Sequence, residues 1–130
     1  MLFDIWRRIF KWKEWNGKGY DTIFNIFYEI KKGNGFVIEY FNNGVIKFMG
    51  EYLNGKRANK GKEYYKFGKV RFIGEYLNGE RNGHGKEYSS KSKLQYEGDY
   101  VNGKRNGKGK EYFDNGKLKF KGKYLNGKRQ

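Results

Sequence analysis

An eight-residue pattern that returns every 24 residues constrains this chain more than any other feature of its sequence. The pattern runs from Phe72 to Gly79 as FIGEYLNG and returns from Tyr96 to Gly103 as YEGDYVNG. The aromatic residue that leads each copy falls at positions 48, 72, 96 and 120. A fixed period of this length is typical of stacked repeats, in which each unit buries its apolar face against its neighbours. We therefore expect one elongated domain of repeated units.

Each copy alternates apolar and polar residues. From Leu118 to Tyr124, leucine, phenylalanine, glycine and tyrosine alternate with three lysines, which predicts a strand with one dry face. Residues 109–113, like residues 61–65 and 85–89, predict a second, shorter strand. We expect a turn-rich link over residues 102–108 and a tight return turn at residues 114–117, where Asn-Gly tolerates positive φ. Each repeat is thus predicted to be a hairpin, and the chain an antiparallel meander.

A glycine stands in the middle of each first strand, where it would normally weaken the strand. We hypothesise that these glycines leave flat room for aromatic rings from adjacent strands to lie across the backbone. The tyrosine that follows each glycine by two residues is expected to belong to the same core. The residues of this predicted repeat core are Gly50, Tyr52, Gly74, Tyr76, Gly98, Tyr100, Gly122 and Tyr124.

The pattern aromatic-x-Gly-x-Tyr, followed by Asn-Gly-Lys-Arg-Asn-Gly-x-Gly, resembles the membrane occupation and recognition nexus (MORN) repeat. The resemblance covers residues 44–130 and extends more weakly back to Trp15. Two departures are that only His84 carries the histidine usual in such repeats, and that tyrosine replaces the common tryptophan. The resemblance implies an elongated, single-layer antiparallel sheet of hairpins. It also implies scaffolding, partner binding or attachment to lipid, and, since bacterial proteins with similar repeats occur beside toxins, an antitoxin or immunity role.

The composition of the 130 residues fits one small domain. The lack of cysteine excludes a disulfide framework and thiolate metal sites, and it fits a reducing compartment, so we expect a cytoplasmic protein, with peripheral attachment to a membrane as the alternative. Aromatic residues make up 20% of the chain, so the core should consist mostly of rings. The net charge of +15 is spread over the repeats, and it reflects either attraction to anions or a codon bias toward lysine.

Residues 1–14 predict a short amphipathic helix, because apolar residues recur at helical spacing and charged residues fall on the opposite arc. Charges interrupt the apolar run, so neither a secretory signal nor a membrane span is expected. The helix either caps the exposed end of the first repeat, which we favour, or lies in a membrane interface as an anchor. Its apolar face comprises Leu2, Phe3, Ile5, Trp6, Ile9 and Phe10.

Residues 15–47 are expected to form a degenerate leading repeat, with strands over residues 24–30 and 36–41. About three and a half repeats over residues 48–130 follow, which brings the sheet to about ten strands. The sequence stops where a second hairpin strand is due. This predicts an open sheet edge that could form a homodimer or pair with a partner.

No set of residues points to catalysis. Carboxylates recur in two rows, whereas a catalytic pair would occur once, so we expect them to pair with lysines across strands. His84 has no second histidine or cysteine to complete a metal site, and the Gly-x-Gly stretches lead into strands, unlike phosphate loops. We therefore expect no enzyme activity, no cofactor and no metal. The rows are Glu51, Glu75 and Asp99, and Glu39, Glu63, Glu87 and Glu111.

Basic residues recur at equivalent link positions and predict a basic edge that faces an anionic surface or partner, unless they are simply solvated. Replacing Arg57 and Arg105 by serine is expected to leave folding intact, whereas replacing Tyr76 and Tyr100 should unfold the middle. The edge comprises Lys56, Arg57, Arg81, Lys104, Arg105, Lys128 and Arg129.

Three kinds of partner fit this pattern to different degrees. The leading hypothesis is a non-catalytic scaffold for a protein partner, at a membrane or away from one. The alternative is direct binding of anionic phospholipid through the basic edge and the N-terminal helix. Nucleic acid is not expected as a partner, because rings committed to packing cannot stack on bases.

Overall fold

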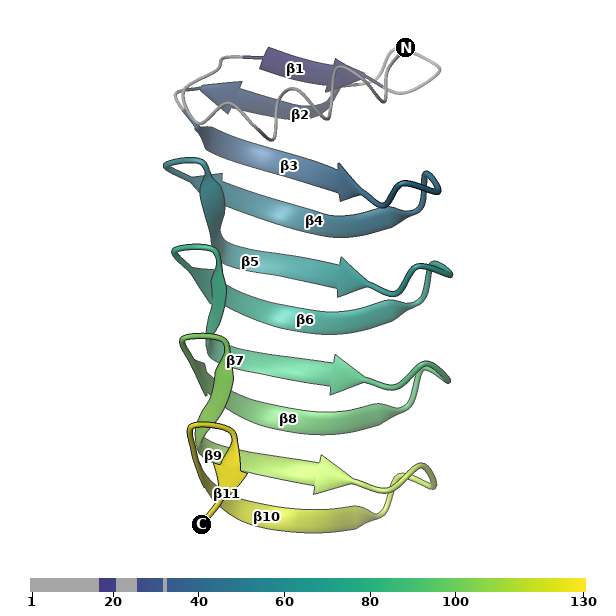
Figure 1. Cartoon of the computed structure of the whole chain (residues 1–130), viewed down its shortest axis with the longest axis vertical. Coiled ribbons are helices and arrows are strands. Elements are labelled where there is room, and N and C mark those ends of the chain that lie inside the picture. The colour runs from purple at the N-terminus through teal and green to yellow at the C-terminus, as the bar shows by residue number, and fades with distance from the viewer. Residues whose placement is uncertain (1–16, 21–25, 32) are drawn as a thin grey trace.

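The computed structural model describes residues 17–20, 26–31 and 33–130 (Figure 1). The helix predicted for residues 1–14, with its apolar face, lies outside the described residues. Within them the chain forms eleven strands. These are β1 (Gly17–Tyr20), β2 (Ile26–Lys31), β3 (Asn34–Tyr40), β4 (Ile46–Leu53), β5 (Lys56–Tyr64), β6 (Val70–Leu77), β7 (Glu80–Tyr88), β8 (Leu94–Val101), β9 (Lys104–Tyr112), β10 (Leu118–Leu125) and β11 (Lys128–Arg129).

The strands form one antiparallel sheet in sequence order, so each strand pairs with its neighbours along the chain. Figure 1 shows them stacked along the long axis as a single curved layer, and the described residues form no second layer. The all-β meander predicted from the 24-residue period is therefore confirmed. β2 and β3 take the places of the two strands expected in the leading repeat.

The turn-rich link expected over residues 102–108 is wrong. Asn102 and Gly103 both have positive φ, 49° and 81°, so they close the hairpin in two residues as a type I′ turn does. β9 then begins at Lys104 and runs on as one strand to Tyr112. The same Asn-Gly turn closes the hairpins at residues 54–55, 78–79 and 126–127.

The link residues instead form a bulge that bends the strand. Gly98 pairs with Gly109 and Tyr100 pairs with Arg105, so β9 has more residues between its two pairings than β8 has. Gly107 lies at the bend with a φ of 100°. The first parts of β5, β7 and β9 consequently run along the stack, at the left in Figure 1.

Aromatic rings form the core on one face of the sheet, which we call the inner face. The rings of Phe48, Phe72 and Tyr96 are fully buried. Each contacts a tyrosine of its own strand and one of the next repeat: the Phe72 centroid lies 5.8 Å from that of Tyr76 and 5.2 Å from that of Tyr100, both edge-to-face. Such a pair contributes roughly 0.5–1.5 kcal/mol beyond its buried area. The inner-face rings are Phe48, Tyr52, Phe72, Tyr76, Tyr96, Tyr100, Phe120 and Tyr124.

The structure confirms that rings lie on the glycines. A Cβ atom added to Gly74 would lie 2.6 Å from Cζ of Phe72, and one added to Gly85 would lie 2.3 Å from the same atom. Gly74 and Gly85 are paired across β6 and β7. The sequence-based hypothesis took the rings from adjacent strands alone, whereas each ring covers the glycine of its own strand and the paired glycine of the next. Two glycines per repeat are therefore needed to seat one ring.

Candidate interaction surface

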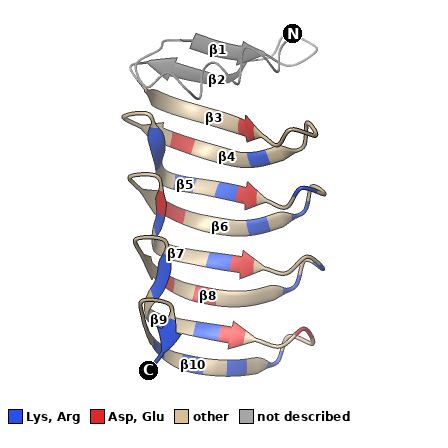
Figure 2. Cartoon of the chain, viewed as in Figure 1, with Lys and Arg blue, Asp and Glu red and all other residues tan. Residues whose placement is uncertain are grey.

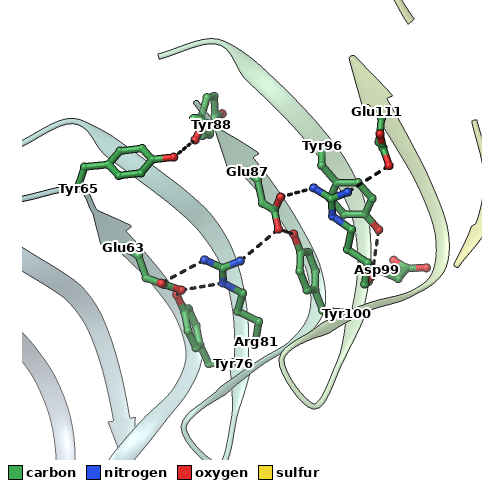
Figure 3. Close-up of polar contacts among 11 residues, drawn as sticks. Glu63, Tyr65, Tyr76, Arg81, Glu87, Tyr88, Tyr96, Asp99, Tyr100 and Glu111 are labelled. Carbon is green, nitrogen blue, oxygen red and sulfur yellow. Dashed lines mark hydrogen bonds and ion pairs between the residues drawn. The ribbon is translucent and has the colours of Figure 1, made fainter. Parts of the chain in front are cut away.

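A glutamate, a tyrosine and an arginine meet on the inner face in each repeat. The Tyr76 hydroxyl donates to Glu63 at 2.6 Å, and Arg81 Nε donates to the same carboxylate at 2.8 Å (Figure 3). The guanidinium of Arg81 also stacks 4.0 Å from the centroid of the Phe72 ring. Charged groups so placed over a buried ring and hydrogen-bonded to one another hold the bent half of β7 against the core.

These groups link into one chain across the repeats. Arg81 Nη1 donates to Glu87 at 3.2 Å, and Glu87 also accepts from Tyr100 at 2.5 Å and from Arg105. Arg105 Nη1 then donates to Glu111 at 3.2 Å. Figure 3 shows the alternation of carboxylate and guanidinium running from one hairpin to the next. The network joins each repeat to its successor, so it belongs to the structural core of the stack.

The network sets the charge of its members. Burial alone would raise the pKa of Glu63, but the hydrogen bond and positive charge of Arg81 hold that pKa below its usual value. The hydrogen bond from Arg129 outweighs burial at Glu111 and lowers its pKa to about 2. Burial raises the pKa of Tyr76, and the Glu63 carboxylate raises it further. At neutral pH Glu63 and Glu111 are therefore ionised and Tyr76 is neutral.

Acid should unfold the protein through these carboxylates. A carboxylate whose pKa is lower in the folded state contributes stability above its unfolded pKa and loses it as pH falls toward the folded value. We expect the melting temperature to hold steady down to about pH 5 and to fall from about pH 4.5 to pH 2. Thermal melts followed by circular dichroism would measure this. Glu111→Gln should flatten part of the decline while Glu80→Gln, at an exposed position, should not; identical acid sensitivity in both variants would contradict the assignment.

The structure divides the predicted basic edge into two groups. The side chains of Arg57, Arg81 and Arg105 are only 20%, 17% and 26% exposed, and each binds inner-face carboxylates. Arg129 binds Glu111 in the same way. These ion pairs argue against the expectation that Arg57 and Arg105 could be replaced by serine without effect on folding. The lysines of the edge, Lys56, Lys104 and Lys128, are exposed, and Figure 2 shows Lys and Arg in blue on the first parts of β5, β7 and β9.

The two rows of carboxylates pair differently from the prediction as well. The row that begins at Glu39 binds arginines 18 residues further along, not lysines. In the other row, Glu75 accepts the backbone N–H of His84 at 2.5 Å and Glu51 accepts that of Lys60 at 3.2 Å, which satisfies donors freed by the bulge. Only Asp99 of that row approaches a basic side chain, with its carboxylate 3.6 Å from Nδ1 of His84.

The opposite, outer face of the sheet carries two open grooves. A groove of about 650 Å³ lies over β3–β7, and a second of about 640 Å³ lies over β7–β10. His84 lines both, so they form one trough, which we call the outer trough. Its floor consists of the backs of the paired glycines. Its side chains include Phe36, Met49, Lys62, Ile73, Lys86, Glu97, Lys108, Lys110, Lys121 and Lys123.

Sequence reasoning did not single out the outer trough. The signal was present in the residues that flank the glycines, Met49, Ile73, Glu97 and Lys121, which differ from repeat to repeat although the glycines do not. Within residues 33–130 no three acidic or histidine side chains cluster as a metal site would require. No helix long and apolar enough to cross a membrane occurs in the described parts of the chain.

A repeated hairpin with an invariant ring, glycine pair and salt-bridged arginine defines the class of open, single-layer β-repeat proteins. Family models agree with this geometry. The model of the MORN repeat matches residues 48–66, 72–92 and 96–117, and that of a MORN repeat variant matches residues 59–78. The chain belongs to the MORN repeat family, whose repeat is a scaffold element and generally non-catalytic. Comparison with functionally described proteins finds no match.

Proposed function

We propose that this protein is a non-catalytic interaction scaffold whose outer face binds a protein partner. The observation that carries the proposal is the difference between the two faces. On the inner face, rings, arginines and glutamates satisfy one another. The outer face has two adjoining grooves of about 650 and 640 Å³, with partly exposed apolar and charged side chains along them. Concave surfaces of this size with both kinds of side chain suit the binding of a peptide segment.

A second candidate is direct attachment to anionic lipid. Leu53, Leu77, Val101 and Leu125 occupy the same position in successive repeats and are 44–54% exposed. Three of these residues face a lysine across the hairpin: Leu53 pairs with Lys56, Val101 with Lys104 and Leu125 with Lys128. Apolar side chains beside lysines favour an anionic membrane surface. Leu77 faces Glu80 instead, which interrupts the stripe and makes lipid the weaker candidate.

A peptide-display selection on the immobilised full chain would test the proposal. We expect selected peptides to lose at least about tenfold in affinity for Ile73→Asp, which places a charge in the outer trough, and less than about twofold for Phe67→Asp, at an exposed turn. Equal binding to both variants and to the parent would contradict an outer-face site.

Vesicle flotation would test the lipid candidate with the same variants. The lipid candidate would be favoured over the peptide if the protein is retained on vesicles that contain phosphatidylserine, if Val101→Asp abolishes this retention and if Ile73→Asp does not affect it. If no peptide is selected and flotation shows this pattern, the protein-partner proposal fails.

A further inference from the structure

We propose that the outer trough binds an extended segment of a partner protein that has apolar side chains at one end and acidic side chains at the other. The inference rests on the proposed function and adds the chemistry and direction of the bound segment. It is carried by the way side chains change along the trough from β3 to β10.

The C-terminal half of the trough places lysines directly opposite lysines. Lys121 pairs with Lys110, and Lys123 pairs with Lys108, across β9 and β10. Like charges directly opposite each other destabilise a sheet. The positions one period earlier hold acids, Glu97 and Asp99, so lysine is not required by the repeat. The arrangement works against folding, and it creates a four-lysine cluster that carboxylates of a partner would neutralise.

The N-terminal half of the trough has a different character. Met49 and Ile73 are partly buried on the outer face, and Phe36 is 41% exposed beside them. Ile38 lies across from Met49, so apolar side chains continue across β3 and β4. Lys62 stands between Met49 and Ile73 in the cross-strand row, and Lys86 stands between Ile73 and Glu97 at the end of this half. A partner segment can bury apolar side chains here.

Acids between the two halves favour a polypeptide over a uniform polyanion. Glu75, Glu97 and Asp99 line the middle of the trough, and Glu97 forms an ion pair with Lys86 at 3.3 Å. A nucleic acid or a lipid surface presents phosphates at every step and would meet these carboxylates. A polypeptide can carry its acids at one end only. Charge complementarity therefore points to a segment that is acidic over β9–β10 and apolar over β3–β6.

The length of the segment follows from the sheet. Seven strand intervals separate β3 from β10, and strands lie about 4.8 Å apart, so the trough is about 34 Å long. An extended chain rises about 3.3 Å per residue, so about ten residues span the trough.

Fluorescence anisotropy with a labelled synthetic peptide would test the proposal. The probe is a peptide of about twelve residues with leucines and phenylalanines in one half and four glutamates in the other. Lys121→Glu with Lys123→Asp restores the acids of the preceding repeat, and we expect it to weaken binding at least about tenfold. The matched control, Lys66→Glu with Lys69→Asp, makes the same change of charge in an exposed turn and should weaken binding less than about twofold. A peptide of the same composition with its glutamates spread evenly should also bind at least about tenfold more weakly.

The thermal stability of the variants shows whether a loss of binding results from unfolding. Because the Lys121→Glu with Lys123→Asp variant removes two like-charge pairs, its thermal midpoint should equal or exceed that of the parent. Any of three results would overturn the proposal. The two charge variants could lose binding equally, or the evenly charged peptide could bind as tightly as the probe. Oligothymidylate could also compete as strongly as unlabelled probe does. If display-selected peptides require Ile73 but ignore Lys121 and Lys123, the scaffold function stands and only the polarity inferred here fails.

Discussion

Gly85→Ala is expected to destabilise the middle of the sheet strongly. Its Cβ atom would lie 2.3 Å from Cζ of Phe72 and 3.3 Å from Cε2 of Tyr100, and both rings are buried and packed edge-to-face. Neither ring can move without breaking contacts to the neighbouring repeat. Overpacking of this kind costs about 2–3 kcal/mol, a large part of the stability of a small single-layer domain. Urea denaturation of the parent and the variant would measure the loss.

The control for Gly85→Ala is Gly116→Asn. Nothing lies within 4 Å of a Cβ atom at Gly116, and asparagine tolerates the positive φ of 85° found there. We expect a change of less than about 0.5 kcal/mol. Phe72→Leu should restore part of the stability of Gly85→Ala, because the smaller side chain leaves room for the methyl group. Equal stability of Gly85→Ala and the parent would show that the ring does not lie on the glycine.

Arg81→Ala should destabilise the sheet by about 2–3 kcal/mol, less than a fully buried ion pair because the side chain is 17% exposed. Removal of the guanidinium leaves Glu63 and Glu87 without a shared cation and uncovers the Phe72 ring. Denaturant midpoints would measure the loss.

Lys104→Ala provides the comparison for Arg81→Ala. Its exposed side chain lies in the same predicted basic edge, so we expect a loss of less than about 0.5 kcal/mol. In a double-mutant cycle, Glu63→Gln and Arg81→Ala should show a coupling of about 1–2 kcal/mol. Equal losses of unfolding free energy for Arg81→Ala and Lys104→Ala would contradict a structural role for the arginine.

The fold could be predicted because each local sequence signal, for a strand or for a turn, occurs in several repeats. The alternation of residues 118–124 fixed the faces, and the Asn-Gly dipeptides marked the hairpins. The bend of β9 was not predictable from the same signals, because Asn106-Gly107 is composed like a turn although its backbone keeps pairing on both sides of a bulge. Ser92, with φ of 63°, keeps a turn where the other repeats have glycine, which shows that the turn geometry persists without its usual residue.

The candidate site was harder to predict for a physical reason. Arg81 and Glu63 lie 18 residues apart on different hairpins, so only the lateral bend of β7 brings them together. From the sequence alone, the arginines of the predicted basic edge were therefore interpreted as solvent-exposed. The outer trough was missed because its floor consists of glycines that sequence reasoning assigned to the core. The contribution of Lys121 becomes visible only when the register places Lys110 opposite it.

Rings that lie on paired glycines hold neighbouring hairpins in one continuous layer. Proton chemical shifts test this most directly, because a glycine Hα that lies under the face of a ring is shifted upfield. We expect the Hα protons of Gly61, Gly85 and Gly109 to be shifted upfield relative to those of Gly68 and Gly116, with nuclear Overhauser contacts from Gly85 Hα to the Phe72 ring. Ordinary shifts at all five glycines and no contact between Gly85 and Phe72 would contradict it.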